Sequence, residues 1–309
     1  MSIAIIFSNR DAQPWADALQ AKLPSAKIEV YPDIADPREV EFILCWKPEK
    51  EVVRQFPNLR VIQSAGAGAD HILNTQTPDE AVSVTRIVDD SLTGDMWEHL
   101  LACVLARMKN FRLYAAQQQQ QQWKGHAYHS IKDTTISILG LGSIGSFVAQ
   151  QFAELGFQVR GWSASSKTLP KVQSYAGAET LPAFMQDTDI LINLLPLTAA
   201  TDSLIDLRFL RQLPKGAYLI NVGRGEHLVE EDLTAALEEG QLSGAMLDVF
   251  RTEPLPATHP FWKNPRITIT PHIASLTNIA AVAGQIADNY NRLLAGEPLI
   301  NLVSKDKGY

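Results

Sequence analysis

A chain of 309 residues is longer than one hydrophobic core usually supports, so two domains are expected. The composition is that of a globular protein, and a net charge of −7 without a basic patch argues against nucleic-acid binding. No apolar stretch approaches the ~20 residues of a membrane span, and the N-terminus lacks the basic segment of a signal peptide, so a cytoplasmic protein without a membrane partner is predicted.

Short apolar runs alternate with amphipathic stretches along the chain. In the first half they occupy residues 3–7, 28–30, 42–44, 61–63 and 82–84; in the second half they occupy residues 136–139, 159–162, 190–194, 218–222, 245–249 and 267–270. Continuous apolar runs are typical of parallel strands that are covered on both faces. Helical spacing between them, as at 144–155 and 231–239, predicts an α/β protein with two doubly wound parallel sheets.

Two long helical patterns divide these two series of strands. Residues 91–116 carry apolar side chains at helical spacing, which predicts one long amphipathic helix that leads into the second domain. Residues 275–294 predict a second long helix that brings the chain back, with the tail 297–309 against the first domain. The predicted domains are therefore 1–98 plus 281–309, and 99–280. The glutamine run 117–122 is interpreted as a solvated helix end or loop.

A glycine-rich loop, GLGSIG, lies between the apolar run 136–139 and the helical pattern 146–155. The strand–turn–helix context distinguishes a dinucleotide-binding loop from a chance match, although a glycine-rich turn without a ligand stays the alternative. Each residue has an expected role: Gly140 permits the tight turn, Gly142 lets the backbone approach a pyrophosphate, Gly145 lets helix and strand pack closely, and the amides of Ser143 and Ile144 face the phosphates.

The loop after the next predicted strand lacks the acidic residue that usually binds the ribose 2′-hydroxyl of NAD. Residues 160–167 contain no carboxylate and offer Ser163, Ser165 and Lys167 instead. Hydroxyl groups and a cation suit a 2′-phosphate, so NADP is predicted as the preferred cofactor, with NAD possible. A plain polar loop is the alternative interpretation.

Three chemically complementary residues follow in the second half: Arg224 in NVGRG, Glu253 in DVFRTEPLP and His272 in TPHIA. They supply an anion-binding guanidinium, a carboxylate and an acid–base imidazole. Individually they could be a surface arginine, a loop carboxylate and a core histidine. The other histidines, among them His227, are interpreted as structural or exposed. Cys45 and Cys103 are distant from each other and lack ligand-spaced neighbours, so buried thiols and no metal site are expected.

Six segments taken together resemble the D-isomer-specific 2-hydroxyacid dehydrogenase family: VIQSAGAGADHIL, GLGSIG, NLLPLTAATDSLI, LINVGRGEHLVEEDLTAAL, GAMLDVFRTEPLP and TPHIA. The resemblance covers nearly the whole chain and implies a Rossmann cofactor domain inserted into a flavodoxin-like substrate domain. It implies that Arg224 binds a 2-oxo acid, that His272 donates a proton to the carbonyl oxygen, and that Glu253 hydrogen-bonds the other imidazole nitrogen and favours the charged form. One departure concerns the ribose loop, where Ala164 and Ser166 stand at positions expected to hold arginine.

The resemblance also implies further residues around the substrate and the cofactor. The backbone amides of Ala67 and Gly68 are expected to bind the substrate carboxylate, and Trp46 to border the substrate or pack between the domains. The remaining cofactor contacts are expected from Leu195, Pro196, Val222 and Asp248, the last through the nicotinamide carboxamide or, alternatively, as a cap or ion-pair partner.

The favoured activity is NADPH-dependent reduction of glyoxylate and hydroxypyruvate to glycolate and D-glycerate. The alternatives are another family activity, of the D-lactate or phosphoglycerate dehydrogenase type, and a non-catalytic dinucleotide-sensing protein on the same scaffold. A homodimer through the helix at 91–116 is expected from the family.

Overall fold

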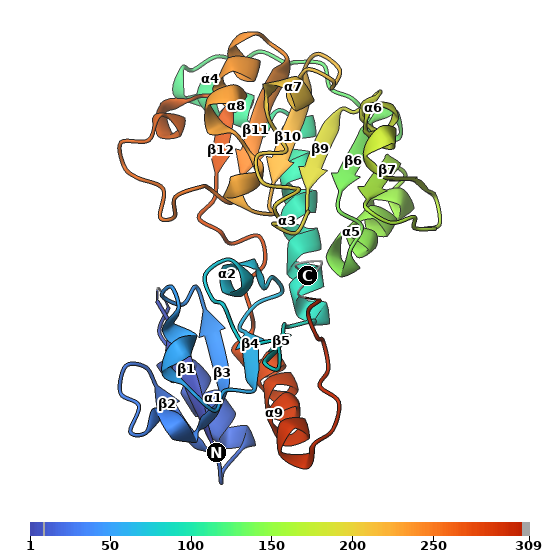
Figure 1. Cartoon of the computed structure of the whole chain (residues 1–309). Coiled ribbons are helices and arrows are strands. Elements are labelled where there is room, and N and C mark those ends of the chain that lie inside the picture. Colours follow the sequence, from blue (N-terminus) through green and yellow to red (C-terminus); the bar gives the residue numbers. More distant parts are fainter. Residues whose placement is uncertain (9, 305–309) are drawn as a thin grey trace. The chain divides into compact units, whose positions relative to one another are not determined.

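The computed structural model describes residues 1–8 and 10–304, which form two separate parallel sheets covered by helices (Figure 1). The chain divides into two compact units, one made of Met1–Leu92 with the segment that begins at Leu276, the other of Thr93–Ser275. The predicted boundaries, after residue 98 and before residue 281, lie a few residues further along the chain than these.

The first unit contains a five-stranded sheet in the order β2-β1-β3-β4-β5, which is the flavodoxin-like order of a doubly wound fold. Strands β1, β3 and β4 are largely buried because helices cover both faces, as expected for continuous apolar runs, whereas the edge strand β2 is partly exposed. The strands are β1 (Ser2–Phe7), β2 (Lys27–Val30), β3 (Val40–Trp46), β4 (Val61–Ser64) and β5 (Ser83–Thr85); the helices are α1 (Gln13–Lys22), α2 (Asp70–Leu73) and α9 (Ile279–Ala295).

The second unit contains a seven-stranded sheet in the order β12-β11-β10-β9-β6-β7-β8, which is the Rossmann order with one added strand. The order reverses between β6 and β9, and this switch point is where such sheets bind ligands. The strands are β6 (Thr135–Leu139), β7 (Gln158–Ser163), β8 (Val172–Ala176), β9 (Ile190–Asn193), β10 (Ala217–Asn221), β11 (Leu242–Leu247) and β12 (Ile267–Ile269). The helices are α3 (Asp90–Met108), which begins just before this unit, α4 (Phe111–Gln119), α5 (Ser143–Glu154), α6 (Leu181–Met185), α7 (Leu207–Leu210) and α8 (Glu230–Glu238).

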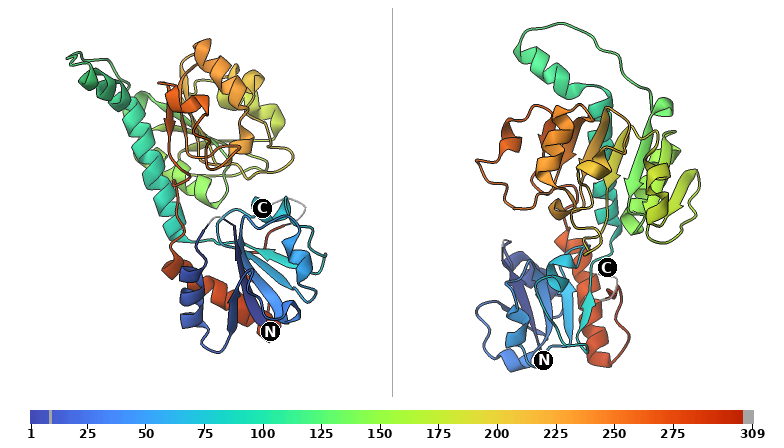
Figure 2. Two further views of the ribbon diagram at one scale, coloured as in Figure 1. Left: turned by 90° about the vertical axis from the view of Figure 1, so that its left-hand side faces the viewer. Right: turned by 45° about the horizontal axis from the view of Figure 1, so that its top comes forward.

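The single long helix predicted at 91–116 is wrong in one respect, because two helices, α3 and α4, occupy this segment (Figure 2). The break lies at Asn110, whose φ of 57° is left-handed and incompatible with continuing an α-helix. The apolar stripe of α3 packs on the core of the seven-stranded unit, where Met96, Leu100, Val104 and Met108 are all buried. This stripe is therefore part of an intramolecular core.

Strand β8 has no counterpart among the predicted strands. Its sequence VQSYA is polar at alternate positions and it forms the edge of the sheet, so it lacks the continuous apolar run by which the buried strands are recognised. Helix α9 begins four residues later than predicted, at Ile279 rather than at 275, because Asn278 caps it by accepting a hydrogen bond from the amide of Ala281.

The predicted tail lies against the first unit as far as the structure describes it. The amide of Val303 donates to the carbonyl oxygen of Val84 at 2.8 Å, and Leu302 forms a bridge with Thr85. Residues 305–309, which complete the predicted tail, lie outside the described residues. Of the described helices, none is both long and apolar enough to cross a membrane; the cytoplasmic location stays a prediction. Cys45 is buried as expected, whereas Cys103 is half-buried.

Candidate active site

The three residues singled out in the second half of the sequence all follow strands of the seven-stranded sheet at its carboxyl edge. Arg224 follows β10, Glu253 follows β11 and His272 follows β12, and these strands are parallel neighbours. Figure 1 shows the arrowheads of these strands at one edge of the sheet. The topology therefore brings three loops, separated along the sequence, to one edge.

His272 and Glu253 form a direct pair. The imidazole Nδ1 lies 2.8 Å from Glu253 Oε2, with 28% and 17% of the two side chains exposed. Because a carboxylate only accepts hydrogen bonds, Nδ1 carries the proton and Nε2 is left for another partner. The amide of Phe250 donates to the other carboxylate oxygen at 3.1 Å and so orients Glu253 from behind.

The backbone at His272 is held in an unusual conformation. Its φ is 55°, in the left-handed region that costs a residue other than glycine energy, and its amide donates to the carbonyl oxygen of Asp248 at 2.8 Å. Both carboxylate oxygens of Asp248 accept from the same loop: from the Thr270 hydroxyl and the Ile273 amide on one side, and from the Ala274 amide on the other. Asp248 is 1% exposed, so in this structure it fixes the histidine loop.

Arg224 lies at the start of the short 3₁₀ helix Gly225–His227 and is half-buried. Its Nη1 donates to the carbonyl oxygen of Gly223 at 2.8 Å. Gly225 is required here, because a Cβ at this position would lie 1.9 Å from the carbonyl carbon of Phe250. The loop that carries Arg224 is thus pressed against the loop that carries Glu253.

A buried polar network lies beneath Arg224, and its central residue was interpreted incompletely from the sequence. Asn193, Asn221 and His227 are each 0% exposed. The Nδ1 atom of His227 accepts from the amide of Arg224 at 3.1 Å, which leaves Nε2 as the donor to the carbonyl oxygen of Pro196 at 3.3 Å. His227 therefore links the arginine loop to the Leu195-Pro196 loop.

The two asparagines of this network come from neighbouring strands. Asn193 ends β9 and Asn221 ends β10, and they are paired in register. The Asn193 amide donates to Asn221 Oδ1 at 2.9 Å, and Asn193 Oδ1 accepts from the amide of Leu195 at 3.2 Å. An asparagine next to the last residue of each of two apolar runs, 190–194 and 218–222, was the available sequence signal for this network.

The glycine-rich loop has the steric properties of a dinucleotide loop. Gly140 has a φ of 100°, and a Cβ there would lie 2.7 Å from the Leu194 carbonyl oxygen. A Cβ on Gly145 would lie 1.8 Å from the carbonyl oxygen of Gly140. At Gly142, by contrast, no atom lies within 4 Å of the ideal Cβ position, so space for a ligand is present next to the backbone. The loop leads into α5, whose first amides, including those of Ser143 and Ile144, have no acceptor within the helix.

The ribose loop lies between β7 and β8 and presents fewer free polar groups for a 2′-phosphate than its composition indicated. Ser163 is 8% exposed, and its hydroxyl donates to the carbonyl oxygen of Ser165 at 2.7 Å, within the loop itself. Ser165 and Lys167 are exposed. Arg160, on β7, pairs with Asp187 at 3.0 Å and is therefore engaged elsewhere.

The remaining predicted cofactor residues follow the central strands β9 and β10. Leu195 and Val222 are 7% and 5% exposed, and Pro196 is half-buried. The amide of Val222 donates to the carbonyl oxygen of Asn193 at 3.3 Å, so these two loops are joined at the switch side of the sheet. Within the described residues, no group of three or more His, Cys, Asp or Glu side chains could hold a metal ion.

In the first unit, Trp46 ends β3, and the turn 64–70 begins at the last residue of the neighbouring strand β4. Trp46 is 7% exposed, and its ring fills the space beside Gly66, where a Cβ would lie 2.4 Å from it. The Ser64 hydroxyl donates to the carbonyl oxygen of Gly68 at 2.7 Å and so closes the turn that contains Ala67. The turn and the indole ring therefore form one packed feature at the carboxyl edge of this sheet.

Comparison with known proteins identifies relatives of this arrangement. Residues 101–274 match the family model described as D-isomer specific 2-hydroxyacid dehydrogenase, NAD binding domain. The chain is 42% identical to a glyoxylate/hydroxypyruvate reductase A of Serratia proteamaculans over 97% of both chains.

Several solved structures resemble the whole chain. A D-isomer specific 2-hydroxyacid dehydrogenase from Xanthobacter autotrophicus Py2, in complex with NADPH and MES, has a TM-score of 0.93 at 36% identity and covers 100% of this chain and 99% of its own. An NADPH-dependent glyoxylate/hydroxypyruvate reductase from Sinorhizobium meliloti, in complex with NADP and sulfate, has a TM-score of 0.92 at 31% identity and covers 100% of both chains.

Proposed function

Because the chain belongs to the D-isomer specific 2-hydroxyacid dehydrogenase family, we propose that it reduces glyoxylate and hydroxypyruvate with NADPH, to glycolate and D-glycerate. The observation that carries the proposal is the His272–Glu253 pair at 2.8 Å on the same sheet edge as Arg224 and the glycine-rich loop. The relatives described above support the substrate and the cofactor.

The proposed roles follow from the chemistry of each group. Arg224 binds the carboxylate and the carbonyl oxygen of the 2-oxo acid, a two-point contact that suits a planar guanidinium. His272 gives the proton on Nε2 to the carbonyl oxygen, and Glu253, hydrogen-bonded to Nδ1, holds the ring and stabilises the imidazolium from which that proton leaves. When bound, NADPH supplies the hydride that the carbonyl carbon accepts.

The residues present fit a dinucleotide. The open space beside Gly142 and the first amides of α5 form a phosphate site, since a helix N-terminus favours an anion. Leu195, Pro196 and Val222 border the cofactor in this proposal. Asp248 retains acceptor capacity for the carboxamide, because two carboxylate oxygens offer about four lone-pair sites and the loop occupies three.

The preference for NADPH is proposed to rest on the loop after β7, where no carboxylate repels a 2′-phosphate. Ser165 and Lys167 are the exposed groups there, while Ser163 shapes the loop. Since Lys167 is exposed and its attraction is screened by solvent, we expect Lys167→Ala to reduce the NADPH-to-NADH ratio of kcat/KM only about threefold to tenfold. Lys171→Ala is the matched control, because Lys171 pairs with Glu154. A wild-type preference for NADH would contradict this part of the proposal.

The decisive assay is the loss of NADPH absorbance with purified protein and a panel of 2-oxo acids. Glyoxylate and hydroxypyruvate are expected to give the highest kcat/KM. Pyruvate or 3-phosphohydroxypyruvate as the best substrate would move the chain to the D-lactate or phosphoglycerate type. Tight NADPH binding without turnover of any 2-oxo acid would favour the dinucleotide-sensing alternative.

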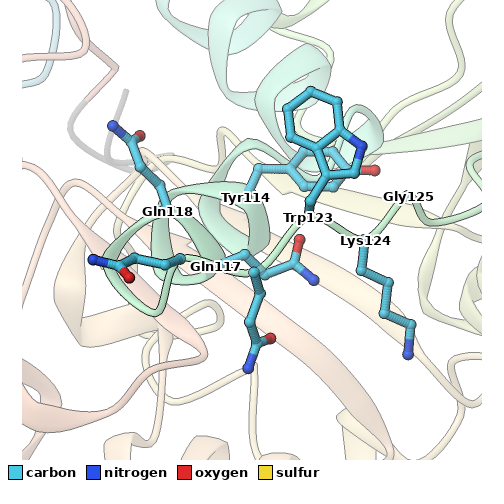
Figure 3. A pocket seen from close by; sticks show the side chains of 8 residues that line it. Tyr114, Gln117, Gln118, Trp123, Lys124 and Gly125 are labelled. Atoms are coloured by element: carbon cyan, nitrogen blue, oxygen red, sulfur yellow. The ribbon is translucent and has the colours of Figure 1, made fainter.

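We further propose a homodimer, formed by α4 and the loop that follows it. Large apolar side chains are exposed there: Trp123 at 103%, Phe111 at 64%, Tyr128 at 61% and Leu113 at 40%. A pocket of about 590 Å³ lies beside them, and Figure 3 shows side chains that line it. The lining includes Tyr114, Trp123 and four glutamines of the run, Gln117, Gln118, Gln121 and Gln122. Clustered exposed apolar surface is typical of protein interfaces, and no predicted active-site residue lines this pocket.

Light scattering tests the dimer. The wild type is expected at twice the chain mass at micromolar concentration, and Trp123→Arg is expected to shift it toward the monomer. Trp262→Arg, at another exposed tryptophan, is the control that should leave the mass unchanged. A monomeric wild type would refute the proposal.

A further inference from the structure

The loop that carries Glu253 has few buried contacts of its own. It joins β11 to β12, and residues 251–260 are all exposed or half-buried. Leu255 packs partly against the core of this unit. Segments with little buried apolar surface open easily, yet the proposed reaction needs Glu253 to stay 2.8 Å from the imidazole of His272. Contacts from outside the loop are therefore important for the position of Glu253.

Glu230, the first residue of α8, accepts hydrogen bonds from this loop at two places. Its Oε1 accepts from the amide of Arg251 at 3.3 Å, and its Oε2 lies 3.2 Å from Nε2 of His259. The amide of Phe261 donates to Nδ1 of His259 at 3.3 Å, which leaves Nε2 as the donor to Glu230. One carboxylate, with 16% of its side chain exposed, thus holds the chain on both sides of Glu253.

The helix that carries Glu230 is well packed. Leu233, Ala236 and Leu237 on α8 are buried in the core that also contains strand β11. Acidic residues in the first turn of a helix often stabilise its N-terminus, and Glu231 occupies such a position as well. Glu231, however, is exposed, whereas both carboxylate oxygens of Glu230 accept from the loop. Glu230 therefore connects a fixed helix to an exposed loop.

The side chain of Arg251 joins the same loop to the arginine loop, which carries Arg224. Its Nε donates to the carbonyl oxygen of Leu228 and its Nη2 to the carbonyl oxygen of Glu226, both at 2.8 Å. Arg251 is thus fixed twice, its amide by Glu230 and its guanidinium by the arginine loop. The start of the exposed segment is held between two elements of the candidate active site.

We propose that Glu230 is a positioning residue for the reaction, because it holds the loop after β11 so that Glu253 stays within reach of His272. This inference rests on the proposed function, since the step that it affects is the proton transfer from His272. Without the Glu230 carboxylate, the amide of Arg251 and the imidazole of His259 lose their common acceptor. Glu253 then spends less time at hydrogen-bond distance from the imidazole, and the proton donor is oriented less well.

The kinetic test compares the reduction of glyoxylate by wild type, Glu230→Ala, Glu230→Gln and Glu231→Ala. Glu230→Ala is expected to lower kcat about tenfold and to leave KM within about twofold, because the orientation of His272 is affected and Arg224 is unchanged. Glu230→Gln should recover part of the loss, since its amide oxygen accepts a hydrogen bond but its NH₂ group cannot accept from His259. Glu231→Ala removes the same charge from the same helical turn and should match wild type.

A double-mutant cycle with Glu253→Ala shows whether Glu230 acts through Glu253. If it does, Glu230→Ala lowers kcat by less than about twofold in a protein that already carries Glu253→Ala, because the contact that it supports is gone. An equal loss in both backgrounds, or an unchanged kcat in folded Glu230→Ala, would overturn the inference.

Should Glu230→Ala fail to fold, His259→Phe takes its place. This substitution removes one of the two loop contacts of Glu230 and keeps an aromatic ring beside Phe261. A fall in kcat of about threefold is expected, and again only where Glu253 is present. An unchanged kcat in folded His259→Phe would overturn the inference.

Proton NMR of the protein without substrate separates this inference from the proposed function. The Nδ1 proton of His272, hydrogen-bonded to Glu253, should give a downfield imidazole signal that is missing from His272→Gln. In Glu230→Ala this signal should be lost to exchange with water, whereas Glu231→Ala should keep it. If wild type fails to reduce glyoxylate, the proposed function is wrong, yet loss of the signal in Glu230→Ala would still support the positioning role. The same signal in wild type and Glu230→Ala would refute that role.

Discussion

The carboxyl edges of the two sheets are built differently. At the edge of the seven-stranded sheet, the polar groups of Asn193, Asn221, His227 and Asp248 are buried and hydrogen-bonded to one another or to the loops. At the edge of the five-stranded sheet, Arg10 is half-buried and spends no donor on the described protein. Buried polar groups with satisfied hydrogen bonds fix geometry, whereas unused donors are available to a ligand.

The hydrogen-bonded edge of the seven-stranded sheet is suited to chemistry that needs fixed geometry. Proton transfer requires reacting groups held within hydrogen-bond reach, which the His272–Glu253 pair and its buried supports provide. Discrimination among substrates requires groups that form their hydrogen bonds with the substrate rather than within the protein. The mutations below test whether the edge of the seven-stranded sheet carries the rate and the geometry of the reaction.

The largest effect is expected from His272→Gln. The loss of the proton donor should lower kcat for glyoxylate about 10²–10⁴-fold, while the affinity for NADPH stays near that of wild type. Stopped-flow reduction and fluorescence titration with NADPH measure the two quantities. A parallel loss of cofactor affinity would show that the substitution disturbs the sheet edge rather than the proton transfer alone.

The next largest effects are expected from two matched substitutions in the glycine-rich loop. Gly145→Ala forces a Cβ to within 1.8 Å of the Gly140 carbonyl oxygen, so the free energy of unfolding should fall by about 1–3 kcal/mol or more. Gly142→Ala adds a Cβ with no atom within 4 Å, so its stability should stay within about 0.5 kcal/mol of wild type.

The affinity for NADPH should also distinguish Gly142→Ala from Gly145→Ala, although their order differs from that of their stabilities. The added methyl of Gly142→Ala occupies the space expected for the pyrophosphate, so the Kd for NADPH should rise about tenfold, which corresponds to about 1.4 kcal/mol. Denaturant titration and cofactor titration of both variants decide this. Normal NADPH binding in Gly142→Ala would remove that residue from the phosphate site.

A smaller effect is expected at His227, which supports Arg224 without being a candidate for proton transfer. His227→Leu leaves the Arg224 amide and the Pro196 carbonyl without their partner, each at a cost of about 1–3 kcal/mol. We expect a rise of about tenfold in the KM for glyoxylate and a lesser change in kcat, with partial recovery in His227→Gln, which restores a donor and an acceptor. Unchanged kinetics in a destabilised His227→Leu would limit the residue to a structural role.

The smallest predicted effect concerns pH and tests the burial of α3 against this unit. Burial lowers the pKa of His99 from its ordinary 6.5, against the opposing influence of Asp248. The unfolded chain therefore takes up the proton first as the pH falls, so stability is lost from about pH 6.5 downward, through the lowered folded-state pKa. His99→Gln should flatten the decline of Tm between about pH 6.5 and 5, whereas exposed His129→Gln should leave it unchanged.

The sequence alone predicted most of the elements in their order, and it singled out His272 and Glu253, which the structure pairs at 2.8 Å. Continuous apolar runs identified eleven of the twelve strands in the described residues, since a strand that is buried on both faces consists mostly of apolar side chains. Strand β8 was not predicted because an edge strand accepts polar residues. The helix break at Asn110 was not predicted because the helical spacing of apolar residues continues across it. Only the folded backbone distinguishes one long helix from two.

Other features depend on residues that are distant in the sequence, and only the tertiary structure decided them. His227 joins the loops after β9 and β10, Asp248 receives three hydrogen bonds from the histidine loop, and the Ser163 hydroxyl turns inward to its own loop. The sequence identifies which groups can donate or accept a proton. Which partner each group meets is set by strand order and register, since these bring remote chain segments within the ~3 Å over which a hydrogen bond forms.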